Sequence, residues 1–411
     1  MVSAVSSPTV RRQSLVRRLG LSFGLALTSV TAAQAGSVAY PNIPAEYLVQ
    51  PDSIPDFWLT EADAIERFLA STVKKGQVEI VGRTAGGRAI RAVTYGTPRE
   101  GRGTTTFSGS LGFRDVRAYL GPDHGKKVFL GLGGVHGGEF EGMAGVVNLI
   151  AVLETGRDLR GREWPGLTEV LGRLDRIILI PLVNVDGRVR VPLRMESFRG
   201  TDKRGHQLFN TGFWANGESI GWPTVKEFIP LDFSRTMFPG GYPNDAGVNL
   251  QHDDFMGRPQ PETRALFDLA ERERPDLIVN MHTGAPPKNY YMRAHRPFME
   301  AKLNPVYDDL YRAIHTALTH AGLQGSRDVA MEADPSRVRP GQFNLDSALN
   351  LHCGALPILI ESPSHSFAGH SREGEPVPHS ADQLVDAQLV AFEAAMTFLA
   401  DRGGRSRWAQ E

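Results

Sequence analysis

The sequence contains only one cysteine, Cys353, and it has no run of basic residues and no internal repeat. A single cysteine excludes a disulfide within the chain, and we expect Cys353 to be a small buried apolar side chain rather than a nucleophile. The missing basic tract argues against a nucleic-acid partner. With 411 residues, 41% of them hydrophobic, the chain can bury a substantial core in one large domain or two ordinary ones.

The first 35 residues have the features of an export signal. Two arginine pairs within 11–18 precede an apolar run at 19–32, and 33–35 (AQA) has the form of a cleavage site. Residues 11–15 (RRQSL) look like a twin-arginine signal, with a general secretory signal or an uncleaved anchor as alternatives. We expect an exported protein, periplasmic or secreted, that keeps no membrane anchor after cleavage. Without these residues, which carry four arginines and no acid, the formal net charge changes from −1 to about −5.

Strand-like and helix-like segments alternate after an N-terminal arm at 36–59. Short apolar runs predict strands at 78–81, 89–94, 128–132, 175–184, 275–281 and 356–360. Helical spacing predicts helices at 60–72 (with a capping box at Thr60), 143–153, 262–272, 301–321 (broken at Pro305) and 381–399. The alternation predicts a single α/β domain over 60–405, with a central mixed, largely parallel sheet flanked by helices. The loop-rich segment 188–242 carries aromatic residues, which favour packed loops rimming a site.

Three of the buried strands end in side chains that suit catalysis. In chain order these are His136 with Glu139, then His282, and then Glu361. If the strands are parallel neighbours, all of these groups meet at one edge of the sheet, where ligands bind in open α/β sheets. Each has a structural alternative: an incidental pair on a glycine-rich turn, a core histidine, or a solvated carboxylate. Their common position favours a site.

The chemistry that this set supports is metal-assisted hydrolysis. Two imidazoles and one carboxylate favour zinc over magnesium or calcium, although cobalt or manganese could substitute. A catalytic zinc lowers the pKa of a water and polarises a carbonyl, while a carboxylate that is not a ligand moves the proton. Glu361 suits the second role because it follows five apolar residues, and desolvation raises a carboxyl pKa.

From about Thr60 onward the sequence resembles the zinc carboxypeptidase family, of the carboxypeptidase A and B type with its bacterial relatives. The motifs that carry the resemblance are 81–88 (VGRTAGGR), 136–139 (HGGE), 181–187 (PLVNVDG), 261–266 (PETRAL), 281–283 (MHT) and 359–361 (LIE). The resemblance implies the zinc carboxypeptidase fold and one zinc ion. It further implies that His136, Glu139 and His282 bind this ion. Glu361 would be the general base.

Three other positions take their meaning from the same resemblance. Residues 198–201 (FRGT) look like the family's W-R-K-T stretch, which would make Arg199 the cation that stabilises the oxyanion. The arginines that compete for this role are Arg188, Arg190 and Arg194. Asn249 stands where the family has an aspartate that orients a zinc histidine. Gly138 stands where some members carry a second arginine.

The strongest departure from the family concerns substrate binding. The family's G-V-D-x-N-R-N-F appears here as 247–255 (GVNLQHDDF), so Gln251 and His252 replace an Asn-Arg pair that holds a terminal carboxylate. A histidine cannot reproduce the bidentate grip of an arginine. Arg258 is a candidate replacement from nearby. Alternatively, His252 with Asp253 and Asp254 could meet a polar or cationic group.

We therefore expect a zinc-dependent, metallocarboxypeptidase-like hydrolase that cleaves peptide-type amide bonds. A zinc-dependent deacylase or amidase acting on a non-peptide or cell-wall-derived amide is the alternative, which the change at Gln251 and His252 favours. A binding protein that has kept the fold and lost catalysis is a third hypothesis, and the complete set of ligands and base argues against it. The expected partner is a peptide or small amide substrate.

Overall fold

A seven-stranded sheet forms the centre of the chain, with strand order β1-β2-β4-β3-β7-β9-β8. The computed structural model describes residues 40, 42–284, 291–323, 340–341, 343–370 and 373–408, so the export signal predicted at 1–35 lies outside them. The strands of the sheet are β1 (Gln77–Arg83), β2 (Ala89–Gly96), β3 (Val128–Leu132), β4 (Arg176–Ile180), β7 (Leu277–Thr283), β8 (Arg293–His295) and β9 (Leu356–Ser362).

The four central strands β4, β3, β7 and β9 are parallel, and the outer strands β1, β2 and β8 run antiparallel to their neighbours. This confirms the prediction of a central mixed sheet with a parallel centre. Because the central strands share one direction, their carboxyl ends lie along the same edge. The turn that follows β3, the end of β7 and the end of β9 therefore meet there.

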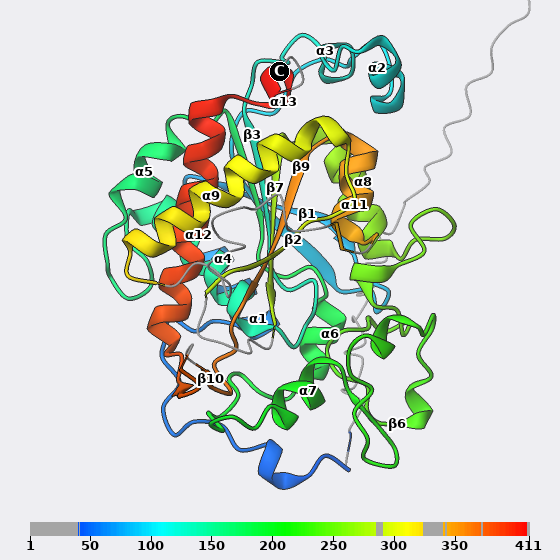
Figure 1. The fold of residues 1–411 in the computed structure, drawn as a ribbon, viewed down its shortest axis with the longest axis vertical. Helices are drawn as coiled ribbons and strands as arrows, with labels where there is room; N and C mark the ends of the chain where they lie inside the picture. Colours follow the sequence, from blue (N-terminus) through cyan, green and yellow to red (C-terminus); the bar gives the residue numbers. More distant parts are fainter. Residues whose placement is uncertain are drawn as a thin grey trace, which may run out of the picture. The chain divides into compact units, whose positions relative to one another are not determined.

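Helices cover both faces of the sheet (Figure 1). On one face lie α1 (Ala62–Thr72), α4 (Phe140–Thr155), α5 (Pro165–Leu171), α9 (Asn304–His320) and α12 (Ala381–Arg402), and on the other α2 (Phe107–Phe113), α3 (Arg117–Leu120), α8 (Pro261–Glu273) and α11 (Leu345–Cys353). Successive strand residues point to opposite faces. Accordingly, Ile177 and Leu179 join the first core, while Ile178 and Ile180 join the second. Burial on both faces explains why these strands read as continuous apolar runs.

The helix α12 is long and apolar enough to cross a membrane by length and composition. Here it packs against α4, α5 and α9, and its Leu384, Phe392 and Met396 are fully buried. These contacts make α12 a core helix of the domain. Its first turn carries a capping box in which Ser380 and Gln383 bond each other's backbone N–H.

Short helices and strands make up the remaining elements that the structure describes. They are η1 (Ala45–Tyr47), α6 (Val185–Arg190), α7 (Arg204–Asn210), β5 (Phe213–Trp214), η2 (Thr224–Lys226), η3 (Phe233–Arg235), β6 (Thr236–Phe238), η4 (Leu250–His252), η5 (Ala301–Leu303), β10 (Gly369–His370), β11 (Pro376–Val377) and α13 (Arg405–Trp408).

Two expectations about helix starts need correction. No capping box forms at Thr60, because its hydroxyl donates to the backbone oxygen of Arg194 and the N-cap residue of α1 is Glu61. Pro305 does not break a helix: it occupies the first turn of α9, where the missing N–H costs nothing. The segment 301–321 is thus a short 3₁₀ turn followed by one continuous helix.

Candidate active site

Two histidines and a glutamate meet at the carboxyl edge of the sheet. Nδ1 of His136 lies 2.9 Å from Oε1 of Glu139 and 3.2 Å from Nδ1 of His282. Nδ1 of His282 lies 3.0 Å from Oε2 of Glu139. All three side chains are buried, and one potential ligand atom from each lies within 4.8 Å of the others. The convergence expected from the strand ends is therefore present.

The spacing and the donor atoms of this group fit zinc. Ligand atoms about 2.0–2.2 Å from a tetrahedral zinc are separated from each other by roughly 3.3–3.6 Å, and the present separations are within about half an ångström of that range. The tautomer of His136 also suits metal binding. Asn249 Oδ1 accepts from the backbone N–H of Gln251 and lies 3.0 Å from Nε2 of His136, so this nitrogen carries the proton. Nδ1 of His136 is left with a lone pair directed at the other two ligands.

The electrostatic field of the group attracts positive charge. Burial opposes a charged imidazole at His282, but the carboxylates of Glu139 and Glu361 outweigh it and raise the pKa of His282 to about 9. Burial, together with the charge on His282, lowers the pKa of His136. Burial alone would raise the pKa of Glu139, yet the two imidazoles hold this pKa well below its usual value. A site that keeps one positive charge among buried ligands is suited to a metal cation.

Glu361 lies beside the group on the neighbouring strand. In the pairing of β7 with β9, His282 and Glu361 stand opposite each other. Oε2 of Glu361 is buried and has no hydrogen-bond partner among the residues that the structure describes. Burial, followed by the charge of Glu139, raises the pKa of Glu361 to about 7. This carboxyl group is therefore close to the metal ligands, on the wall of the site and able to exchange a proton near neutral pH.

A cavity of about 540 Å³ opens onto these groups. Its walls include His136, His282, Glu361, Gln251, His252, Tyr242, Lys203, Arg293 and Arg296. Part of the wall comes from Lys203, Thr211 and Trp222, so the loop-rich segment 188–242 does border the site, as expected. A cavity of this volume suits a small substrate or the end of a peptide.

Gln251 and His252 line the cavity, but neither offers a positive charge. The side-chain amide of Gln251 donates to Oδ2 of the buried Asp346 at 2.6 Å. Burial lowers the pKa of His252 to about 4, so its imidazole is neutral at pH 7. Asp346, which also accepts from Asn280, connects this segment to the strand that carries His282.

Neither of the arginines predicted for substrate or oxyanion binding lines the cavity. The guanidinium of Arg199 contacts the backbone oxygen of Glu46 and lies over the ring of Tyr47, with 5.1 Å to its centroid. Arg258 is exposed, and its backbone N–H bonds to Asp254 in a local turn. The competing Arg188, Arg190 and Arg194 are bonded elsewhere. The arginines that do line the cavity, within the described ranges, are Arg293 and Arg296.

The departure at Gly138 has a steric cause. A Cβ at this position would lie 2.4 Å from the backbone oxygen of Phe209 and 3.0 Å from Cα of Asn210. The end of α7 therefore fills the space that a side chain would need. From there, Asn210 donates to Oε1 of Glu139 at 3.2 Å, which helps to orient this ligand.

Two side chains at the site, Tyr242 and His206, were not predicted from the spacing of the motifs. Tyr242 stacks on His136 with ring centroids 3.5 Å apart and an interplanar angle of 10°. His206 lines the cavity. Burial alone would lower the pKa of His206, but the carboxylate of Glu196, with its Oε1 3.7 Å from Nδ1 of His206, outweighs it and raises this pKa. Both residues come from the irregular segment 188–242 and the helix within it. The aromatic content of that segment was the available signal, but it did not single out either residue.

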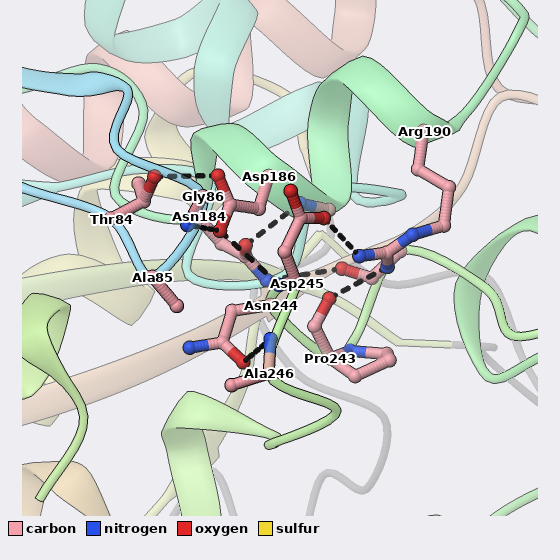
Figure 2. Close-up of polar contacts among 12 residues, drawn as sticks. Thr84, Ala85, Gly86, Asn184, Asp186, Arg190, Pro243, Asn244, Asp245 and Ala246 are labelled. Carbon is pink, nitrogen blue, oxygen red and sulfur yellow. Dashed lines mark hydrogen bonds and ion pairs between the residues drawn. The ribbon is translucent and has the colours of Figure 1, made fainter. Parts of the chain in front are cut away.

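The buried carboxylate of Asp186 holds the segment at Asp245 (Figure 2), which lies between Tyr242 and Asn249 in the chain. Asp186 accepts from the hydroxyl of Thr84 at 2.5 Å, from the N–H of Gly86 at 2.8 Å and from the N–H of Asp245 at 3.2 Å. Arg88 forms ion pairs with both aspartates, at 2.7 and 2.6 Å. The motifs at 81–88 and 181–187 thus act together as a support for the segment 242–249.

Comparison with known proteins agrees with this geometry. A family model described as zinc carboxypeptidase matches residues 65–311, and the chain therefore belongs to the zinc carboxypeptidase family. Within this family it is a zinc metallohydrolase of the class that acts on peptide substrates. The comparison with curated proteins gave no match.

Several solved structures are similar to the chain. A metallo-carboxypeptidase from Burkholderia cenocepacia has 16% identity and a TM-score of 0.48, with 82% of this chain and 69% of that chain covered. A metallo-carboxypeptidase from Pseudomonas aeruginosa has 15% identity and a TM-score of 0.46, with 82% and 67% covered. Bovine thrombin-activatable fibrinolysis inhibitor has 12% identity and a TM-score of 0.43, with 82% and 95% covered.

Proposed function

We propose that the chain hydrolyses peptide-type amide bonds with one zinc ion bound by His136, Glu139 and His282, and with Glu361 as the general base. The observation that carries the proposal is the position of Glu361. It is opposite His282 on the next strand, and it has a buried oxygen with no partner among the described residues. A carboxylate in this position is close to the ligands without being one of them.

When bound, zinc supplies a Lewis acid that lowers the pKa of a water and polarises the substrate carbonyl. Glu361 takes the proton of the attacking water and passes it to the leaving nitrogen, since it is the one acid among the described residues that line the cavity. Asn249 and Asn210 keep His136 and Glu139 in their orientations through the hydrogen bonds described above. Tyr242 covers one face of His136 and so shields this ligand from water.

The direct test is Glu361→Gln, which keeps the size of the side chain and removes the base. We expect kcat on an N-acyl dipeptide to fall by roughly 10²- to 10⁴-fold, the usual contribution of a general base, with one zinc per chain retained. Metal content by mass spectrometry separates loss of the base from loss of the metal. A variant that binds zinc and keeps its full rate would refute the assignment of Glu361.

The second candidate function is a deacylase or amidase that acts on a non-peptide amide. It is favoured by Gln251 and His252, because the first is bonded to Asp346 and the second is uncharged, so neither can bind a terminal carboxylate strongly. Product analysis on N-acyl amino acids and peptides separates the two functions. Preferential cleavage of N-acyl amino acids would identify a deacylase, and preferential trimming of peptides a carboxypeptidase.

We also propose that the chain is exported through the signal expected at residues 1–35. The support is the sequence alone: two arginine pairs, an apolar run and an Ala-Gln-Ala cleavage site. N-terminal sequencing of the exported protein should begin at Gly36. Replacement of Arg11 and Arg12 by lysine should block export if the twin-arginine route is used, and should have little effect on a general secretory signal.

A further inference from the structure

The edge strand β8 places a cation next to the proposed base. Arg293 is the antiparallel partner of Glu361, and His295 is the partner of Leu359. Directly opposite residues point to the same face of a sheet, with Cβ atoms about 5 Å apart. Since His282 is the partner of Glu361 on the other side, the side chains of His282, Glu361 and Arg293 form a row across three strands. All three line the cavity.

The charges around this row leave Arg293 available for a ligand. Among the described residues that line the cavity, the lysine and arginine side chains are Lys203, Arg293 and Arg296, and the acid is Glu361. Nε2 of His295 lies 3.7 Å from Oε1 of Glu361, so this imidazole faces the base and not the free space of the cavity. Arg296 forms an ion pair with Asp308, so its charge is balanced within the protein. Arg293 makes no hydrogen bond or ion pair with any residue in the described ranges, and it acts on Glu361 only as a nearby charge. Lys203 stands at the exposed start of α7, on the rim.

The direction of the row shows which part of a substrate would meet Arg293. The carbonyl that is attacked must lie near the metal ligands, hence near His282. Glu361 delivers its proton to the leaving nitrogen, and the group attached to that nitrogen then extends past Glu361 toward β8. An arginine at that place can bind a carboxylate with two parallel hydrogen bonds.

We propose that Arg293 binds a carboxylate on the leaving group, and that it replaces the cation missing at positions 251–252. This rests on the hydrolase function proposed above and deepens it by naming the substrate class. The substrates are peptides or N-acyl amino acids whose released residue carries a free carboxylate close to the scissile nitrogen. A substrate with a carboxamide at that place leaves Arg293 buried against an uncharged group.

The test compares one N-acyl dipeptide with its C-terminal carboxamide on the zinc-loaded protein. Wild type should cleave the free acid with the higher kcat/KM. Arg293→Gln should lower kcat/KM for the free acid by roughly 10- to 100-fold, mainly through KM, and leave the carboxamide unchanged. Arg293→Lys keeps the charge, so its kcat/KM for the free acid should lie between that of wild type and that of Arg293→Gln. Arg264→Gln, which removes an exposed arginine of α8, is the matched control.

Two results would overturn the inference. One is an unchanged preference of Arg293→Gln for the free acid over the carboxamide. If Arg258→Gln loses this preference, the carboxylate is bound by Arg258 and not by Arg293. The other is an equal loss of kcat on both substrates, which would mean that Arg293 acts on the reacting carbonyl or on Glu361. Zinc content and circular dichroism of each variant show whether the site and the fold have been kept.

Binding measurements separate this inference from the proposed reaction. N-acetylglycine and N-acetylglycinamide can be titrated into the zinc-loaded protein and followed by ligand-observed NMR. If wild type cleaves nothing but prefers N-acetylglycine, and Arg293→Gln abolishes that preference, the reaction is refuted and the carboxylate site stands. If hydrolysis occurs without any preference that depends on Arg293, the carboxylate site is refuted and the reaction stands.

Discussion

At the scale of single residues, hydrogen bonds outside the metal ligands decide which atoms face the metal. Asn249 is the clearest case, because its amide is oriented by the N–H of Gln251 and then fixes the proton of His136 on Nε2. A carboxylate at this position would hold the same proton more strongly. The amide therefore preserves the orientation of the ring and makes the histidine a slightly weaker ligand.

The substitution Asn249→Leu tests this role. It removes the acceptor for Nε2 of His136, so the ring loses both its tautomer and its orientation, and we expect zinc affinity to fall by roughly 10- to 100-fold. Competition with a chromophoric chelator measures this change. Asn249→Asp is the opposite control and should bind zinc at least as tightly as wild type. Equal zinc affinity in all three proteins would mean that Asn249 does not orient the ligand.

A second residue-scale prediction concerns the close approach at Gly138. Gly138→Ala places a Cβ against the backbone oxygen of Phe209, which cannot move away without shifting α7. We expect a loss of about 1–3 kcal/mol in the free energy of unfolding, measured with urea. Gly112→Ala on α2, where a Cβ meets nothing within 4 Å, should be neutral or stabilising by up to about 1 kcal/mol. A similar effect of both substitutions would exclude the steric explanation.

At the scale of elements, the β1–β2 hairpin supports the site although it lies at the far edge of the sheet. Asp186 accepts hydrogen bonds from Thr84 and Gly86 of the hairpin turn and forms an ion pair with Arg88. Asp186 also accepts from the N–H of Asp245, in the segment between Tyr242 and Asn249 (Figure 2). On the other side, Glu262 at the start of α8 accepts from the N–H of Ala85 and from the amide of Asn244. Two buried carboxylates thus connect a hairpin, a helix and the loop that borders the ligands.

The substitution Asp186→Asn tests this connection. Asp186 is fully buried, so the change removes one acceptor oxygen and leaves Arg88 with a weaker partner. We expect a loss of about 2–3 kcal/mol in the free energy of unfolding and a weaker affinity for zinc, because the loop that carries Asn249 loosens. Asp245→Asn, whose carboxylate is partly exposed, should cost less than about 1 kcal/mol. Equal costs would contradict a central role for Asp186.

At the scale of the whole molecule, sequence reasoning succeeded where the structure follows from chain direction and polarity. The runs 128–132 and 356–360 are apolar on both faces, which is typical of covered parallel strands, and the ends of parallel neighbours meet at one edge. It did not find β8, because 293–295 is too short for a periodic pattern. Arg199 matched a motif by spacing, yet contacts with Glu46 and Tyr47 of the N-terminal arm hold it away from the cavity. Such long-range contacts leave no local signal.

The stability of the molecule in acid depends in part on one helix-end carboxylate. Glu154, near the end of α4, accepts the backbone N–H groups of Lys74, Lys75 and Gly76 at 2.8, 2.8 and 2.9 Å, and so fixes the turn between α1 and β1. Burial alone would raise the pKa of Glu154, but these three donors outweigh it and lower the pKa. A carboxyl group whose pKa is lower in the folded state stabilises the fold above its unfolded pKa of about 4.3. That contribution is lost as the pH falls through the folded value.

We therefore expect Glu154→Gln to lower the free energy of unfolding by about 1–2 kcal/mol at pH 7, because one amide oxygen cannot replace two carboxylate oxygens. The difference from wild type should shrink steadily below pH 4, since wild type then loses its own carboxylate. Urea unfolding at pH 7, 5 and 3.5 measures this trend. Glu163→Gln, on the surface beside Arg157, should change the free energy by less than about 1 kcal/mol at every pH. A cost at position 154 that stays constant from pH 7 to 3.5 would show that the side chain contributes by packing and not by its charge.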